Sequence, residues 1–265
     1  MHNLFLKTME WIDTHAHLYL EEFALDLQSI VDRARQNNVS KIMLPNIDLE
    51  SFPRMLELSN QFPGFFYPMI GLHPCDVNAN WEIELQKIKS QFSSDTFIAI
   101  GETGIDLHWD SSTLEIQKLA FKQQIQWAKD WHLPIVIHAR KSTSIILDII
   151  ESEMTPDLTG IFHCFSGNEQ EAERLKALNN FKVGIGGSVT YKNSELPQVL
   201  KKIPLSLIVL ETDSPFLPPV PYRGKRNESA YIPLVGEAIS NIYQISLDKV
   251  AEITTNNAKE IFKLA

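Results

Sequence analysis

The chain has 265 residues and a mass of 30.2 kDa, with 44% hydrophobic and 22% charged residues, a composition typical of globular proteins. No apolar run reaches the roughly 18 residues that a membrane span needs, and two cysteines, Cys75 and Cys164, are too few for a disulfide framework. The formal net charge of −9 argues against nonspecific binding of nucleic acid, because such binders are usually basic. A polyanionic substrate therefore needs local attraction, from bound cations or a few arginines.

The first residues of the sequence bear on localisation. Glu10 and Asp13 follow the opening apolar residues too early for a signal peptide. We therefore expect a cytoplasmic protein without a membrane partner, in which a reducing environment keeps both cysteines as thiols.

Eight short runs rich in β-forming residues alternate with longer segments of helical period. Between the runs lie amphipathic segments such as 23–38, 113–131 and 143–154, in which apolar side chains recur at steps of three and four residues. Residues 215–229 show neither pattern and are predicted to form a loop. Residues 231–265 are predicted to form two or three closing helices, one capped by Ser246. The predicted strands are residues 11–17, 41–47, 65–74, 97–106, 133–140, 160–167, 181–188 and 207–214.

Strands that alternate with helices predict a parallel sheet with right-handed crossovers, and eight such units in about 250 residues match a closed barrel. An open, doubly wound sheet is the alternative. Polar residues follow nearly every predicted strand, whereas an open sheet concentrates them at one crevice. The sequence therefore predicts an α/β fold, a (β/α)8 TIM barrel that spans residues 1–265 as a single domain.

Histidines at the predicted strand ends indicate a metal site. Strand alternation places Asp13, His15 and His17 on one face, directed toward the barrel mouth. A single histidine after a strand is usually an ordinary polar residue, but four histidines and an aspartate at one rim form a ligand set for Zn²⁺, Mn²⁺ or Fe²⁺. The residues that join the first two histidines at this rim, each after an apolar run, are His138, His163 and Asp213.

Glu102 directly follows the apolar run of the fourth predicted strand, between Gly101 and Gly104, which leave room for close approach. A carboxylate there can bridge two metal ions. Two divalent ions about 3.5–4 Å apart can share a hydroxide and lower the pKa of its parent water. We expect Asp213 to serve as both ligand and base, and Asp106 to orient a histidine from behind.

Seven motifs between residues 13 and 228 resemble the TatD family of metal-dependent deoxyribonucleases: DTHAHL, GLHP, GETGID, IHAR, HCFSG, ETDSP and RGKRNE. The resemblance implies a barrel that hydrolyses phosphodiester bonds in DNA, often from a 3′ end, with activity supported by Mg²⁺ or Mn²⁺. It also implies that one to three divalent ions are bound by His15, His17, Glu102, His138, His163 and Asp213.

Similarity places His73 of GLHP near the substrate, where an imidazole can contact a phosphate or protonate a leaving oxygen. Arg140, Arg223 and Arg226 are candidates for phosphate contacts, because guanidinium binds phosphate oxygens in a bidentate manner. Lys225 has the same charge, but we favour a solvated loop residue there.

The substrate class has two further interpretations. An amide or ester hydrolase, such as a D-aminoacyl-tRNA deacylase, would use the same metal site, and a silent scaffold would only bind a partner. We favour a monomeric enzyme that acts on DNA, and on RNA as a second substrate. The mixed nitrogen and oxygen ligands fit Zn²⁺, Mn²⁺ or Fe²⁺ better than Mg²⁺.

Overall fold

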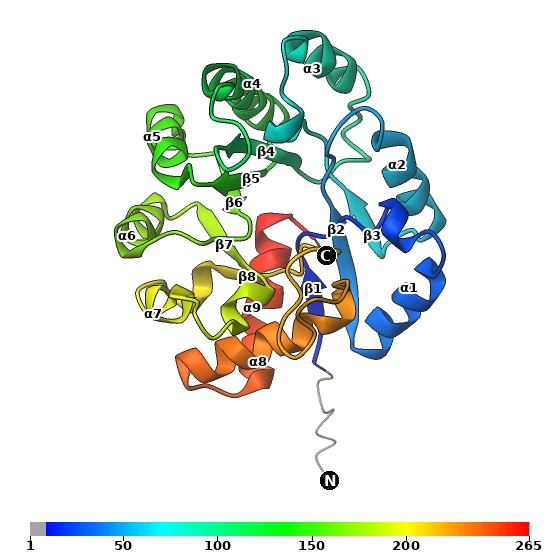
Figure 1. Ribbon diagram of the computed structural model, residues 1–265, viewed down its shortest axis with the longest axis vertical. Helices are drawn as coiled ribbons and strands as arrows, with labels where there is room; N and C mark the ends of the chain where they lie inside the picture. The colour runs from blue at the N-terminus through cyan, green and yellow to red at the C-terminus, as the bar shows by residue number, and fades with distance from the viewer. Residues whose placement is uncertain (1–8, 265) are drawn as a thin grey trace.

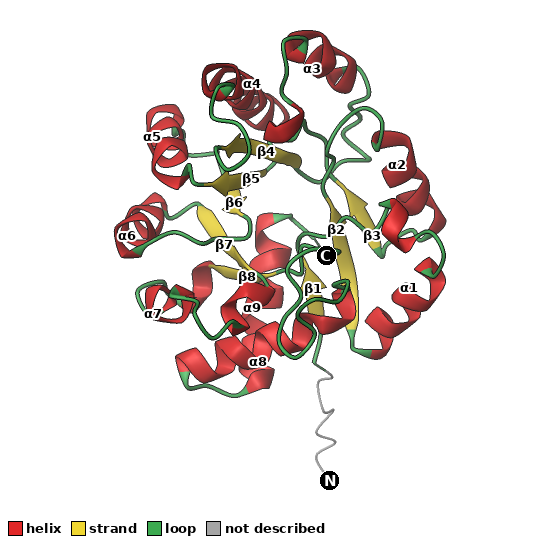
Figure 2. Ribbon diagram, viewed as in Figure 1, coloured by secondary structure: helices red, strands yellow, loops and turns green. Residues whose placement is uncertain are grey.

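The structure is a computed structural model that describes residues 9–264. A ring of helices surrounds a barrel of parallel strands (Figure 1), and Figure 2 separates the two layers by colour. The TIM barrel expected from the sequence is confirmed. The strands are β1 Trp11–Asp13, β2 Val39–Leu44, β3 Phe66–Pro68, β4 Ile100–Asp106, β5 Ile135–Arg140, β6 Gly160–Phe162, β7 Phe181–Ile185 and β8 Ile208–Leu210.

Each predicted strand is present, and helices follow the strands in the order that the barrel requires. The loop prediction is confirmed over residues 215–228, which contain no helix or strand, whereas Ser229 begins a short 3-10 helix. The helices are α1 Leu27–Gln36, α2 Phe52–Gln61, α3 Trp81–Lys89, α4 Leu114–Trp131, α5 Thr143–Glu153, α6 Glu169–Leu178, α7 Leu196–Leu200, α8 Ile232–Tyr243 and α9 Leu247–Ile261.

The ring of strands consists of two arcs, β1-β2-β3 and β4-β5-β6-β7-β8. Isolated parallel bridges join them, from Ala16 to Ser214 on one side and from Ile70 to Ile100 on the other. Backbone hydrogen bonds support both seams: the Thr14 amide donates to the Leu210 carbonyl at 3.0 Å, and the Gly101 amide donates to the Ile70 carbonyl at 2.9 Å. The barrel therefore closes through single bridges at two seams.

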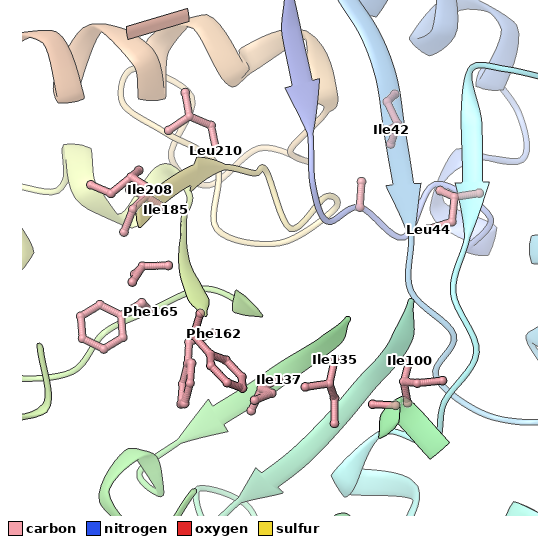
Figure 3. Close-up of a cluster of buried hydrophobic side chains, with 14 of the residues drawn as sticks. Ile42, Leu44, Ile100, Ile135, Ile137, Phe162, Phe165, Ile185, Ile208 and Leu210 are labelled. Carbon is pink, nitrogen blue, oxygen red and sulfur yellow. The ribbon is translucent and has the colours of Figure 1, made fainter. Parts of the chain in front are cut away.

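Alternation along the strands separates two hydrophobic clusters. Ile42 and Leu44 pack in the larger cluster with the surrounding helices, whereas Met43 between them belongs to the smaller one. Figure 3 shows side chains of the larger cluster from β2 and from β4 to β8. The smaller cluster takes residues from β1, β2, β5, β6 and β8 and joins them to the C-terminal helix: Ile12, Met43, Val136, Ile161, Val209, Ala258, Ile261 and Phe262.

Helix α9 therefore packs against the interior face of the strands, and it lies beside β1 and β8 in Figure 1. Ser246 caps this helix as predicted, because its side chain accepts a hydrogen bond from the Lys249 amide. The prediction that no signal peptide is present rests largely on residues 1–8, which lie outside the described residues. No helix within residues 9–264 combines the length and apolar character needed to cross a membrane.

Candidate metal centre

The six predicted ligands come together at the carboxyl ends of the strands, where barrel enzymes carry their chemistry. The same alternation that packs the interior places them. Val136 lies in the smaller hydrophobic cluster, which faces the barrel interior, and His138 follows two residues later. The same spacing relates Ile161 to His163. The inner apolar layer is thus continued at the rim by imidazoles.

Strand β1 is shorter than predicted and ends at Asp13, so His15 and His17 lie in the segment just beyond it. Alternation alone predicted that the Asp13 side chain would point to the mouth with these histidines, but it does not. Its carboxylate instead accepts hydrogen bonds from the Thr212 amide at 2.9 Å and the Thr212 hydroxyl at 2.6 Å. Burial raises the pKa of Asp13 to about 7. This residue joins the ends of β1 and β8.

Glu102 lies at the centre of the cluster, and its two oxygens face different histidines. Oε2 lies 3.1 Å from His15 Nε2 and 3.4 Å from His17 Nε2. Oε1 lies 2.9 Å from His138 Nδ1 and 2.8 Å from His163 Nε2. The carboxylate therefore divides these four imidazoles into two pairs, and a cation bound by either pair would also be in reach of Glu102.

Asp213 completes the half that contains His15 and His17. Its Oδ1 lies 3.7 Å from His15 Nε2 and 3.5 Å from His17 Nε2. The Asp213 backbone is left-handed, with φ of 56°, and 13% of the side chain is exposed. Glu102, by contrast, is 3% exposed. Asp213 is therefore the carboxylate of this half that solvent or a substrate can reach.

Partners behind two of the histidines determine which ring nitrogen faces the cluster. The Tyr19 hydroxyl donates to the Pro45 carbonyl at 2.6 Å, so it accepts from His17 Nδ1, 3.0 Å away. His138 Nε2 lies 2.9 Å from Asp106 Oδ2 and donates to it. In its neutral form each ring therefore directs a lone pair at the cluster, as metal ligands require. Asp106 was anticipated in this role, whereas Tyr19 was missed despite its two-residue spacing from His17.

In His73, unlike in His17 and His138, the ring proton points toward the cluster. The Cys75 amide donates to His73 Nδ1 at 3.1 Å, so the neutral ring carries its hydrogen on Nε2. This Nε2 lies 3.5 Å from Glu102 Oε1, with 15% of the side chain exposed. His73 therefore presents a hydrogen-bond donor at the edge of the cluster rather than a lone pair.

Sequence analysis also missed Glu211, which lies behind His163. Glu211 is fully buried; its Oε1 accepts from the Cys164 amide at 2.6 Å and lies 3.4 Å from His163 Nδ1. A side chain at Gly184 would collide with Glu211 Oε2 and press on His163. The signal was present in the sequence, since Glu211 precedes Asp213 by two residues after the same apolar run.

Two residues fix the backbone around Glu102. The Glu102 amide donates to the Asn46 carbonyl at 3.0 Å, and the buried Asn46 side chain donates to the Gly71 carbonyl at 2.6 Å. Gly104 has a φ of 143°, and a side chain there would collide with the His138 carbonyl. The close approach that the glycines of this segment suggested therefore holds at Gly104.

The charges of the cluster favour a bound cation. Burial alone would raise the pKa of Glu102, but the imidazoles of His163 and His15 hold it well below its ordinary value. Burial opposes a charge on His17, yet Asp213 and Glu102 raise its pKa to about 9. The carboxylates thus remain ionised, and compensating positive charge must come from protons or from metal ions.

The donor set fits divalent metal ions. His15 Nε2 lies 3.2 Å from His17 Nε2, and His163 Nε2 lies 3.4 Å from His138 Nδ1. Nitrogen lone pairs at these separations repel unless a proton or a cation lies between them. Imidazole nitrogens with carboxylate oxygens are the usual ligands of Zn²⁺, Mn²⁺ and Fe²⁺.

The loop that follows β8 is anchored to the start of the barrel. Arg226 forms a bidentate pair with Asp26, at 2.9 and 2.6 Å, and also donates to the Glu22 carbonyl. Arg33 of α1 forms a second bidentate pair, with Glu228, at 2.8 and 2.6 Å. The guanidinium of Arg226 is therefore engaged in holding the loop, and the structure offers no support for its expected phosphate contact.

The other two arginines predicted to contact phosphate, Arg140 and Arg223, are exposed and lie against aromatic rings. The Arg140 guanidinium is 5.5 Å from the centroid of Trp109, and that of Arg223 is 4.2 Å from the centroid of Tyr191. The Lys225 ammonium, 5.7 Å from the Tyr222 ring, is also exposed. Arg140 and Arg223 remain candidates for contact with an anionic substrate.

A closed (β/α)8 barrel with imidazoles and carboxylates in this arrangement at its strand ends defines a metal-dependent hydrolase. The family model described as TatD related DNase matches residues 12–263, and the chain belongs to this family. The metal-dependent hydrolase YabD of Bacillus subtilis is 40% identical over 95% of this chain and 98% of its own.

Solved structures agree with this assignment. The crystal structure of YjjV, a TatD homologue from Escherichia coli, superposes with a TM-score of 0.90 at 29% identity, over 97% of this chain and 99% of that one. A TatD family hydrolase from Entamoeba histolytica has the same fold, with a TM-score of 0.85 at 23% identity over 96% of this chain and 98% of its own.

Proposed function

We propose that this hydrolase cleaves phosphodiester bonds of DNA from a 3′ end, with RNA as a second substrate. The observation that carries the proposal is the division of the cluster by Glu102, because two adjacent cation sites suit in-line displacement at phosphorus. The family description as TatD related DNase supports DNA as the substrate. We propose that each chain binds two divalent ions. Mg²⁺ or Mn²⁺ supports activity, and Zn²⁺ is a third metal that can occupy the same sites.

The six ligands we propose fall into two sets that share Glu102. His15, His17 and Asp213 would hold one ion, and His138 and His163 would hold the other. Bound divalent ions supply Lewis acidity toward a phosphoryl oxygen and lower the pKa of water. The protein keeps the donor atoms in place through Asp106, Tyr19 and other partners behind the rings.

Two groups of the chain are placed to move protons. Asp213 is ionised, since burial raises its pKa but His17 and the other imidazoles lower it below the ordinary value. Its partly exposed carboxylate accepts a proton from the attacking water. His73 presents Nε2–H at the cluster edge, where it donates to the phosphate or to the leaving oxygen. Arg140 and Arg223 hold further phosphates from the rim.

The test is digestion of 5′-labelled single-stranded DNA by metal-stripped protein that is resupplied separately with Mg²⁺, Mn²⁺ and Zn²⁺. We expect products that shorten from the 3′ end. Glu102→Ala should lose one metal ion and several orders of magnitude in rate, with an unchanged circular dichroism spectrum. A protein that cleaves no DNA with any metal, but hydrolyses an aminoacyl ester, would contradict the proposal.

Asp213→Asn separates metal binding from proton transfer. The amide can still donate a lone pair to a cation but cannot accept a proton, so we expect metal to be retained in part while turnover collapses. Metal content by plasma mass spectrometry and the rate of digestion are measured on the same sample. A nearly normal rate would exclude Asp213 as the base.

A further inference from the structure

Two exposed aromatic side chains follow barrel strands at the mouth. Among the described residues, the aromatic groups that stand out as exposed large hydrophobics are Trp109, 73% exposed, and Phe216, 49% exposed. Trp109 lies three residues after β4, and Phe216 lies six residues after β8. Exposed flat rings at the mouth of a site are available to stack on a ligand.

Phe216 lies directly beside the half of the cluster that contains His17. The two ring centroids are 6.1 Å apart, with an interplanar angle of 66°. The Asn227 side chain donates to the carbonyls of Thr212 and Phe216, at 2.6 and 2.7 Å, and the Phe216 amide donates to the Asp213 carbonyl at 2.8 Å. The ring is therefore held on a fixed turn next to one cation site.

Trp109 lies beside the other half. The Asp106 carboxylate, which bonds His138 through Oδ2, accepts the His108 amide at 2.7 Å through Oδ1 and also bonds the Trp109 backbone. The Trp109 ring packs edge to face on His108, with centroids 4.8 Å apart, and contacts the Arg140 guanidinium. Trp109 is thus linked through Asp106 to the half of the cluster that contains His138, whereas Phe216 lies beside the half that contains His17.

The charge near the loop that carries Phe216 favours an anionic ligand. A pocket of about 300 Å³ has two cationic residues and no acidic residue in its lining, although the whole chain has a net charge of −9. The Tyr191 hydroxyl donates to the Pro218 carbonyl at 3.0 Å, which joins this pocket to the loop that holds Phe216. The pocket is lined by Ser188, Tyr191, Lys192, Asn193, Ser194 and Arg223.

We infer that the mouth binds single-stranded nucleic acid, with unpaired bases stacked on Phe216 and Trp109 and a neighbouring phosphate in the Arg223 pocket. The inference rests on the proposed function and adds the way in which its substrate is recognised. A chain that alternates flat bases with phosphates matches aromatic rings beside guanidinium groups. A base-paired duplex fits less well, because its base faces are already stacked on neighbouring pairs.

Binding is measured by fluorescence anisotropy with metal-stripped protein, which cannot cleave its ligand. The ligands are a labelled thymidine octanucleotide and an abasic octamer with the same number of phosphates. We expect the wild-type protein to bind the thymidine oligomer about tenfold more tightly than the abasic one. Phe216→Ala and Trp109→Ala should each remove part of this difference, and the double variant most of it, whereas Leu119→Ala, at an exposed position of α4, should retain it.

Trp109→Tyr and Phe216→Tyr should retain the preference, because each keeps a flat ring. Equal binding of both oligomers by the wild-type protein, or an alanine variant that keeps the full preference, would overturn the inference. Preference for a peptide over either oligomer would overturn it as well. Hydrolysis of the abasic octamer by manganese-loaded wild-type protein tests the proposed function separately, because that ligand offers no base to stack.

Discussion

Three of the four histidine ligands have a polar group near the far side of the ring, and these groups differ in kind. Among the described residues the buried His15 Nδ1 has no hydrogen-bond partner. A hydroxyl lies behind His17, a carboxylate behind His138 and a second carboxylate behind His163. Such groups set the orientation of the ring and the position of its proton, and their removal usually weakens metal binding. His73 has an amide donor behind it instead, which gives the ring the opposite polarity toward the cluster.

Glu211 provides the sharpest test of whether the groups behind the imidazoles affect metal binding. Glu211→Gln removes the negative charge behind His163, so we expect metal affinity to fall by about 10- to 100-fold. Gly184→Ala should have a similar effect, because the added carbon displaces the same carboxylate. Isothermal titration with Mn²⁺ measures both.

Gly186→Ala is the matched control, since a side chain there meets Glu211 only at ordinary contact distances, from 3.6 Å upward. An unchanged affinity in Glu211→Gln would show that the charge of this carboxylate does not act on the centre.

Helix α4 positions two strand ends through buried glutamines seven residues apart. Gln117 accepts from the Asp106 amide at 2.8 Å and donates to the Asp106 carbonyl at 3.2 Å. Gln124 makes the same pair of bonds to Leu72, at 2.8 and 3.2 Å, directly before His73. One face of this helix thus holds the backbone on both sides of Glu102.

Gln124→Met keeps the length of the side chain but leaves the buried Leu72 amide and carbonyl without these partners. We expect the free energy of unfolding to fall by about 2 kcal/mol, measured by urea denaturation. Gln126→Met, an exposed position on the same helix that bonds only Asp130, should change it little. Equal stabilities of the two variants would contradict the role assigned to Gln124.

Glu10 connects the start of β1 to β2 and α9 through Ser40 and Lys259, each at 2.8 Å. Burial raises the pKa of Glu10, but these two bonds outweigh burial and leave the pKa below its ordinary value. A carboxylate of this kind stabilises the fold above its ordinary pKa, and the contribution is lost as the pH falls through the folded value.

We therefore expect Glu10→Gln to lower the free energy of unfolding by about 0.5 kcal/mol at neutral pH, a small effect because both partners are partly exposed. The two proteins should converge in acid, once the pH falls below the folded pKa of Glu10. Glu173→Gln, which breaks an exposed pair with Lys176 within α6, is the control and should have a smaller effect at either pH. A difference that persists in acid would argue against the ion pair.

The metal centre joins parts of the chain that are far apart in sequence, because its ligands come from both arcs of the barrel. A metal that binds only the folded state stabilises it by mass action, by about 2.7 kcal/mol at a concentration one hundred times its dissociation constant. We expect Mn²⁺ or Zn²⁺ to raise the melting temperature of metal-stripped protein by about 5–10 °C.

Differential scanning calorimetry measures this shift, and Glu102→Ala should show a much smaller one. A melting temperature that does not respond to any divalent ion would contradict tight binding at the cluster.

The sequence by itself determined the barrel and the six residues at its rim. Both follow from local rules: the alternation of strands and helices specifies a closed parallel sheet, and a polar residue directly after a strand lies at the carboxyl end of that sheet. These rules need only the order of residues along one strand. They therefore place His138 and His163 at the same rim, although 25 residues separate them.

Only the tertiary structure decided which atoms face one another. The division of Glu102 between two pairs of histidines, the support from Glu211 and Asn46, and the engagement of Arg226 by Asp26 all depend on contacts between distant segments. Strand alternation also failed for Asp13, whose carboxylate bonds Thr212 beyond β8, whereas His15 and His17 reach the cluster as predicted. Such contacts depend on packing in three dimensions, which periodicity along a single strand does not encode.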